Sequence, residues 1–126
     1  MRGWVVAAIV SGLPSTAHAV VSGRNPLEAT RAAGSLLVGE EASTAARLAA
    51  ALPVHFALSW LWGGVLERLL PRRNRVLWGA AGGLCIAALD LGVVGRRSPA
   101  IEQLPLVPQL ADHAVFGAVV GALAPD

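Results

Sequence analysis

The apolar residues of this chain fall into four blocks, each about as long as a helix that crosses a bilayer. The blocks cover about 3–21, 46–67, 76–95 and 106–124, and one crossing needs roughly 20 residues. Only 14% of the residues are charged, whereas about 25% are charged in a typical soluble domain. Because lipid offers no hydrogen bonds to a backbone, such blocks must be helical. The sequence therefore predicts an all-α fold, an integral membrane four-helix bundle, with 1–126 as a single transmembrane domain.

A short amphipathic helix is expected between the first two blocks. Asn25 and Pro26 are typical of a helix start, and Glu28 follows in the first turn, where a negative charge is favourable. Such a helix lies in the headgroup region of a membrane, and a partly ordered loop is the alternative. Its two faces are apolar (Ala29, Ala32, Ala33, Leu36, Leu37) and polar (Glu28, Arg31, Ser35).

Arginines mark the ends of the apolar blocks. All ten basic residues are arginines, and those within 68–75 form a dense cluster in the short turn between the second and third blocks. The abundance of Ala, Gly, Arg and Pro indicates a GC-rich bacterial genome. Positively charged short loops favour the cytoplasm, which predicts that both termini of this plasma-membrane protein are cytoplasmic. This prediction rests on the density of the cluster, because five arginines lie on each side of the membrane in this topology. No basic stripe alternates with aromatic residues, so nucleic acid is not an expected partner.

Apart from Arg47 and Glu67 at the ends of the second block, five residues with acidic or imidazole side chains lie inside the apolar blocks: His18, His55, Asp90, Asp112 and His113. At helical spacing, each block's ionisable group shares a stripe with small or hydroxylic residues, where membrane helices pack closely. The helical rise puts all five in the half of the membrane nearest the 26–37 segment. We therefore expect them to face a common interior. The glycines expected to mediate helix packing are Gly79, Gly83, Gly117 and Gly121.

Ionisable residues inside membrane spans usually mark a functional site. Imidazoles and carboxylates bind transition metals and exchange protons, so the first hypothesis is ion binding or passage, with a metal or a proton as the ion. Haem ligation by His55 and His113 is disfavoured, because two Phe and four Trp are few to line a haem pocket. No particular cofactor is identified by the sequence.

Two further hypotheses remain open. In the first, the chain is a structural or accessory subunit of a larger membrane complex, or a homo-oligomeric scaffold, and the polar residues only set the helix register. In the second, it is an enzyme that modifies a lipid or an isoprenoid, with Asp90 and His113 as an acid–base pair. The lipid bilayer is the expected partner in each case.

Three segments resemble small uncharacterised four-helix membrane proteins of high-GC, actinobacterial-type bacteria. They are GLPSTAH at 12–18, HFALS at 55–59 and DHAVFG at 112–117. The resemblance covers most of the chain and implies four membrane helices. It implies no activity and no site residues.

The first block also resembles a secretory signal peptide, with Ala17-His18-Ala19 as a cleavage site. The apolar run continues through Val20 and Val21, so we expect this block to be retained as the first span. Mass spectrometry of the purified protein should then find an N-terminus upstream of Val20. A mature chain that begins at Val20 would lack His18 and would contradict the four-span topology.

Overall fold

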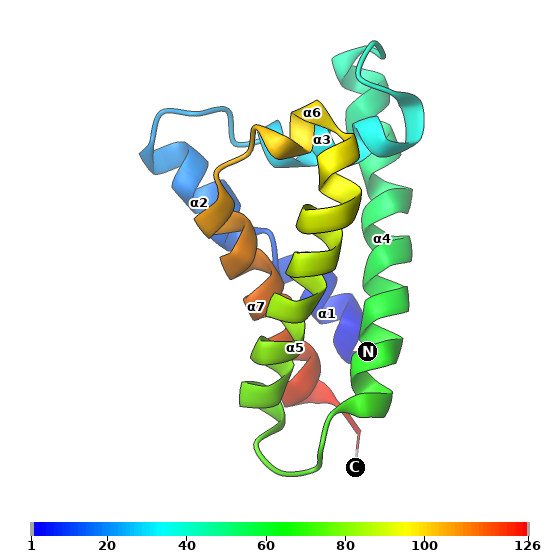
Figure 1. Ribbon diagram of the computed structural model, residues 1–126, viewed down its shortest axis with the longest axis vertical. Helices are drawn as coiled ribbons and strands as arrows, with labels where there is room; N and C mark the ends of the chain where they lie inside the picture. The colour runs from blue at the N-terminus through cyan, green and yellow to red at the C-terminus, as the bar shows by residue number, and fades with distance from the viewer. Residues whose placement is uncertain (1, 126) are drawn as a thin grey trace.

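The computed structural model describes residues 2–125, and within this range the chain is helical without a strand. The predicted all-α fold is confirmed. The long helices run up and down the long axis of the molecule (Figure 1). They are α1 (Gly3–Val10), α2 (Leu13–Val21), α3 (Glu28–Val38), α4 (Thr44–Leu69), α5 (Arg75–Leu89), the π-helical η1 (Asp90–Val94), the 3₁₀-helical η2 (Gly95–Arg97), α6 (Pro99–Glu102) and α7 (Leu106–Leu123).

Among residues 2–125, four helical segments are long and apolar enough to cross a membrane. They are Gly3–Val21, Thr44–Leu69, Arg75–Arg97 and Leu106–Leu123, and each matches one predicted block. The second begins at Thr44 because Ser43 is its N-cap: the Ser43 hydroxyl accepts a hydrogen bond from the Ala46 N–H at 3.1 Å.

The first segment is two helices and not the single helix expected from its apolar run. α1 ends at Val10, and α2 begins at Leu13. Pro14 explains the interruption, because it has no N–H for the carbonyl of Val10 and its ring clashes with a carbonyl four residues earlier. Gly12 precedes α2 as its N-cap but has no side chain to cap the helix. The interruption therefore leaves backbone groups that other parts of the protein must satisfy.

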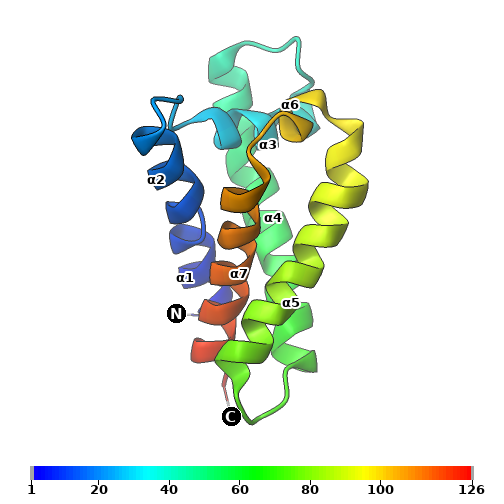
Figure 2. The same cartoon turned by 60° about the vertical axis from the view of Figure 1, so that its left-hand side comes forward.

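The two ends of the molecule differ, as Figures 1 and 2 show. α3 and α6 lie across one end, here called the α3 end. The turn between α4 and α5 lies at the other, here called the turn end, together with the chain termini. Arg75 ties the C-terminal segment to this end, since its Nη1 donates to the carbonyls of Ala124 (2.9 Å) and Pro125 (2.8 Å).

The expected helix between the first two blocks is α3, although it starts later than the sequence suggested. Asn25 does not cap it: the Asn25 side chain accepts from the Leu27 N–H at 2.9 Å and forms a turn before the helix. α3 packs along α4 because Gly34 has no side chain and lies directly against the Arg47 carbonyl. α3 ends where Gly39 adopts a φ of 85°, which favours glycine.

α7 occupies the centre of the molecule and contacts α1, α2, α4 and α5. Its most extensive contact is with α5, where Gly79 of α5 and Gly117 of α7 bring the two backbones together. Gly83 similarly lies against the His113 carbonyl, and Gly121 against the Arg75 carbonyl. The buried apolar cluster beside this contact consists of Ala7, Leu66, Ile86, Phe116 and Val120.

We expect Gly117→Ala to destabilise the protein by about 1–3 kcal/mol, because the added methyl group would overlap the carbonyl of Gly79. The midpoint of thermal unfolding in detergent, followed by circular dichroism, measures the effect. Gly92→Ala is the matched control, since a methyl group there would meet no atom within 4 Å. Equal losses in both variants would show that the close α5–α7 contact does not matter for stability.

Candidate functional site

The five predicted site residues separate into two groups in the structure. Asp90 and His113 are partly buried where α5, η1 and α7 meet, and Asp112 is partly buried where α7 faces α2, whereas His18 and His55 are among the exposed residues of the single chain. His18 therefore lies apart from the expected common interior, but a ring nitrogen of His55 reaches the carbonyl of the buried Ala8. Their neighbours on the same stripes, such as Ser15 and Ser59, are buried.

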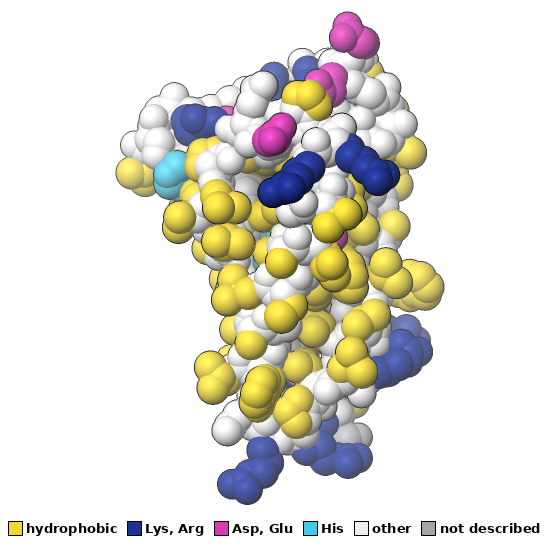
Figure 3. Space-filling model, viewed as in Figure 1, with side chains coloured by type: hydrophobic (Ala, Val, Ile, Leu, Met, Phe, Trp, Pro, Cys, Tyr) yellow, Lys and Arg dark blue, Asp and Glu magenta, His cyan; other side chains and the backbone are white. Residues whose placement is uncertain are grey.

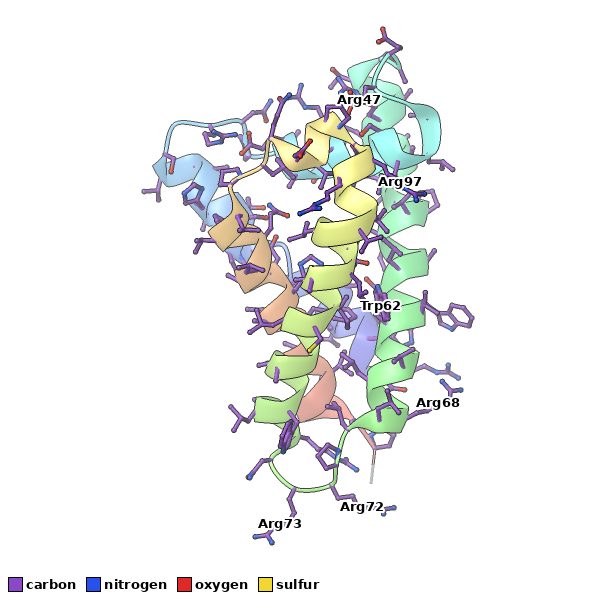
Figure 4. All side chains as sticks on the ribbon, viewed as in Figure 1. Arg47, Trp62, Arg68, Arg72, Arg73 and Arg97 are labelled. Atoms are coloured by element: carbon purple, nitrogen blue, oxygen red, sulfur yellow. The ribbon has the colours of Figure 1, made fainter. Side chains whose placement is uncertain are left out.

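Asp90 and His113 form the central contact of the site. Asp90 Oδ2 lies 3.4 Å from His113 Nε2, and each side chain is only about one-fifth exposed. Asp90 Oδ1 accepts a hydrogen bond from the Trp62 indole N–H at 3.3 Å, and Figure 4 shows Trp62 between α4 and α5. The pair thus connects three of the four long apolar segments.

The backbone around Asp90 is widened. Asp90 is the first residue of η1, where its carbonyl accepts from the Gly95 N–H five residues later. Single π-helical turns of this kind occur frequently at functional sites. The absence of a side chain at Gly95 leaves room for the π-helical turn beside Ile101, because a Cβ atom there would approach both Ile101 and the Asp90 carbonyl.

The other nitrogen of His113 decides where its proton lies. Nδ1 is 2.8 Å from the carbonyl oxygen of Gln109, which can only accept a hydrogen bond. Nδ1 must therefore carry a hydrogen, and in a neutral ring Nε2 would have only a lone pair. A lone pair and an ionised carboxylate repel each other, so a second hydrogen on His113 or a hydrogen on Asp90 would make the contact between the two side chains favourable.

Asp112 caps α2 from another helix. Its Oδ1 accepts a hydrogen bond from the Ser15 N–H at 2.8 Å. Ser15 is the third residue of α2, the position that a side-chain cap normally serves, and the local N-cap Gly12 has no side chain. The carboxylate also lies at the positive end of the helix dipole. Asp112 therefore replaces the missing cap at the interruption of the first segment.

His55 satisfies the other side of the same interruption. Its Nε2 donates to the Ala8 carbonyl in the last turn of α1, at 2.6 Å. In a continuous helix this carbonyl would accept from Gly12. Asp112 of α7 thus accepts from one backbone N–H left free by the break, and His55 of α4 donates to one backbone carbonyl left free by it.

His18 stands apart from this arrangement. It lies near the C-terminus of α2, and its Nε2 is 3.4 Å from the Ser22 hydroxyl. Its position near the helix end is typical of a side chain that reaches toward water.

The described side chains do not assemble a metal site: residues 2–125 contain no group of three His, Cys, Asp or Glu placed to hold an ion. Two surface hollows open at the ends of the molecule, and neither is lined by Asp90 or His113.

Trp62 is the site residue that the sequence analysis did not identify as such. It lies seven residues after His55 and so falls on the same helical stripe, which was a usable signal. The two carbonyl partners, from Ala8 and Gln109, have no signal in the sequence. These two carbonyls are identified as partners only by the positions of the helices and side chains in the structure.

The chain matches no protein-family model, and neither a curated protein nor a solved structure is significantly similar to it.

We expect Asp112→Ala to cost about 1–3 kcal/mol of stability, because the Ser15 N–H would lose its acceptor. Asp112→Asn keeps an oxygen at this position and should retain most of the stability. Unfolding midpoints and amide hydrogen exchange at 11–16 would measure both effects. If the Asn and Ala variants lose equal stability, hydrogen-bond acceptance is not the role of Asp112.

Proposed function

We propose that this chain is an integral membrane protein that binds a proton between Asp90 and His113 and passes it within the membrane. The observation that carries the proposal is the hydrogen bond from His113 Nδ1 to the Gln109 carbonyl. It directs Nε2 toward Asp90 and requires one further proton on the pair.

The apolar surface supports a location in the membrane. In the four long segments, only 22% to 28% of the residues of the most apolar window are buried within the chain, so the others remain at least partly exposed. Leu77, Val107 and Leu52 are each more than 60% exposed. Figure 3 shows hydrophobic side chains over the middle of the molecule, with charged side chains concentrated toward its ends. Exposure of an apolar surface of this extent is unfavourable in water and favourable in the hydrocarbon of a membrane.

The charge balance explains why such a pair would hold a proton. With one shared proton, Asp90 and His113 are neutral together, whether as an ion pair or as a neutral acid and imidazole. Loss of that proton would leave a net negative charge inside an apolar segment, which is costly. Release therefore requires contact with water or with a second acceptor. Asp112, the residue next to His113 in sequence, is a second acidic side chain in this segment.

We place α3 at the membrane surface and both termini in the cytoplasm, at the plasma membrane of a bacterium. The cluster of Arg68, Arg72 and Arg73 beside the turn supports this orientation, since all three are exposed at the turn end (Figure 4). In this orientation Asp90 and His113 lie in the outer half of the membrane.

A second function is favoured by the two backbone caps. His55 and Asp112 use their polar atoms to hold the interrupted first segment, which is a structural role. If Asp90 and His113 only join helices in the same way, the chain is an accessory subunit or a scaffold that pairs with its own copies. Proton binding by the pair distinguishes the two functions.

For the proton site, we expect wild-type protein at neutral pH to carry the extra proton on His113 Nε2 or on Asp90. Nitrogen-15 NMR of labelled histidine and the infrared carboxyl band distinguish these two forms. In Asp90→Asn, His113 should become neutral, with its hydrogen on Nδ1. A wild-type His113 that is neutral beside an ionised Asp90 would contradict the proposed site.

For proton passage, we expect vesicles containing the wild-type protein to dissipate a pH gradient faster than protein-free vesicles. Asp90→Asn should reduce the rate to that of protein-free vesicles, because the pair would no longer bind a proton. Glu102→Gln removes an exposed carboxylate from α6 and should leave the rate unchanged. A wild-type rate equal to that of protein-free vesicles would favour the accessory role.

A further inference from the structure

We propose that the α3 end carries a binding site for a phosphate group, supplied by the headgroup of an anionic phospholipid. The site is a polar hollow of about 210 Å³ formed where α3, the start of α4 and the α6 region meet. Arg24, Arg31 and Arg47 line it, together with Glu28 and Gln103. It is separate from the Asp90–His113 pair and does not depend on the proposed proton site.

The three arginines of the hollow differ in whether they have an acidic partner. Arg24 is paired: its Nε lies 2.7 Å from the Glu28 carboxylate, whose hydrogen bond raises the pKa of the guanidinium. Arg31 and Arg47 have no ion pair among those found within residues 2–125. With one carboxylate among three guanidinium groups, the hollow has an excess of positive charge.

Two arginines that line the hollow each have a buried donor without an acceptor. The Nε atoms of Arg31 and Arg47 are buried, and neither makes a hydrogen bond within the described part of the chain. A buried donor without a partner is unfavourable, and a charged one more so. An anion in the hollow would lie beside both guanidinium groups and offset this cost.

Phosphate suits this arrangement better than a carboxylate side chain would. Its several oxygens can accept from two planar guanidinium groups that approach from different helices, here α3 and α4. The Gln103 amide adds a neutral hydrogen-bonding group from beyond α6. Two contacts hold these elements together. Gly34 allows α3 to pack against the Arg47 carbonyl of α4, and the Glu40 side chain, just after α3, accepts from the Ala100 N–H of α6 at 2.7 Å.

The position of the hollow points to a lipid as the source of the phosphate. Arg47 lies at the α3 end, where the long apolar segments finish (Figure 4). In the proposed membrane orientation this is the level of the headgroups. α3 also leaves Leu36, Leu37 and Val38 exposed, as expected of a helix that rests on lipid. Clusters of arginine beside membrane helices are known to recognise anionic headgroups.

The test is native mass spectrometry of the full-length detergent-purified protein, titrated with phosphatidylglycerol, phosphatidylcholine or inorganic phosphate. Arg31→Gln/Arg47→Gln removes the two unpaired guanidinium groups. Arg72→Gln/Arg73→Gln is the matched control, because it removes the same charge from the exposed turn at the opposite end. Arg31→Lys/Arg47→Lys keeps the charge but loses the planar donors, and unfolding midpoints show whether each variant is folded.

We expect one phosphatidylglycerol to bind per chain and to bind about tenfold or more weakly to the Arg31/Arg47 variant, with little change in the turn variant. Phosphatidylcholine should bind less tightly, because its ammonium group would meet arginines. Binding of inorganic phosphate that is lost in the same variant would also support a phosphate site, with a soluble ligand as its source. Equal weakening in both double variants, or none in either, would overturn the proposal.

Discussion

The close contact between α5 and α7 is the interaction on which the rest of the arrangement depends. Gly79 and Gly117 allow the two backbones to touch, and this contact brings Asp90 beside His113. A larger residue at either glycine would overlap the opposite backbone and push the two helices apart. Since α7 also contacts α1, α2 and α4, its position determines where Asp112 meets the first segment.

The interruption of the first segment creates the second requirement of the fold. A helix in an apolar environment must pair its backbone groups, and the break at Pro14 leaves some of them free. Asp112 and His55 supply one acceptor and one donor from two different helices. Polar side chains in these apolar segments therefore have two kinds of partner: backbone at the break, and each other at the Asp90–His113 pair.

Much of the helix layout was predictable because hydropathy and local capping are properties of short stretches of sequence. The four apolar blocks and a helix close to 28–38 are all present. The break in the first segment was not predicted, although Pro14, which lacks an N–H, is visible in the sequence. Trp62 was not predicted as a site residue, because its partner, Asp90, lies in a different helix.

The sequence by itself determined that this chain is helical, how long its apolar segments are, and that each contains an ionisable residue. Only the tertiary structure decided which of these residues meet. Helical phase indicates which face a side chain occupies, but the partner depends on how helices cross and how closely they approach. Asp90 and His113 are 23 positions apart and adjacent in space, whereas His18 shares its stripe with buried serines and is itself exposed. Backbone carbonyls and N–H groups occur at nearly every position, so no sequence pattern marks Gln109, Ala8 or Ser15 as the ones that bind a side chain.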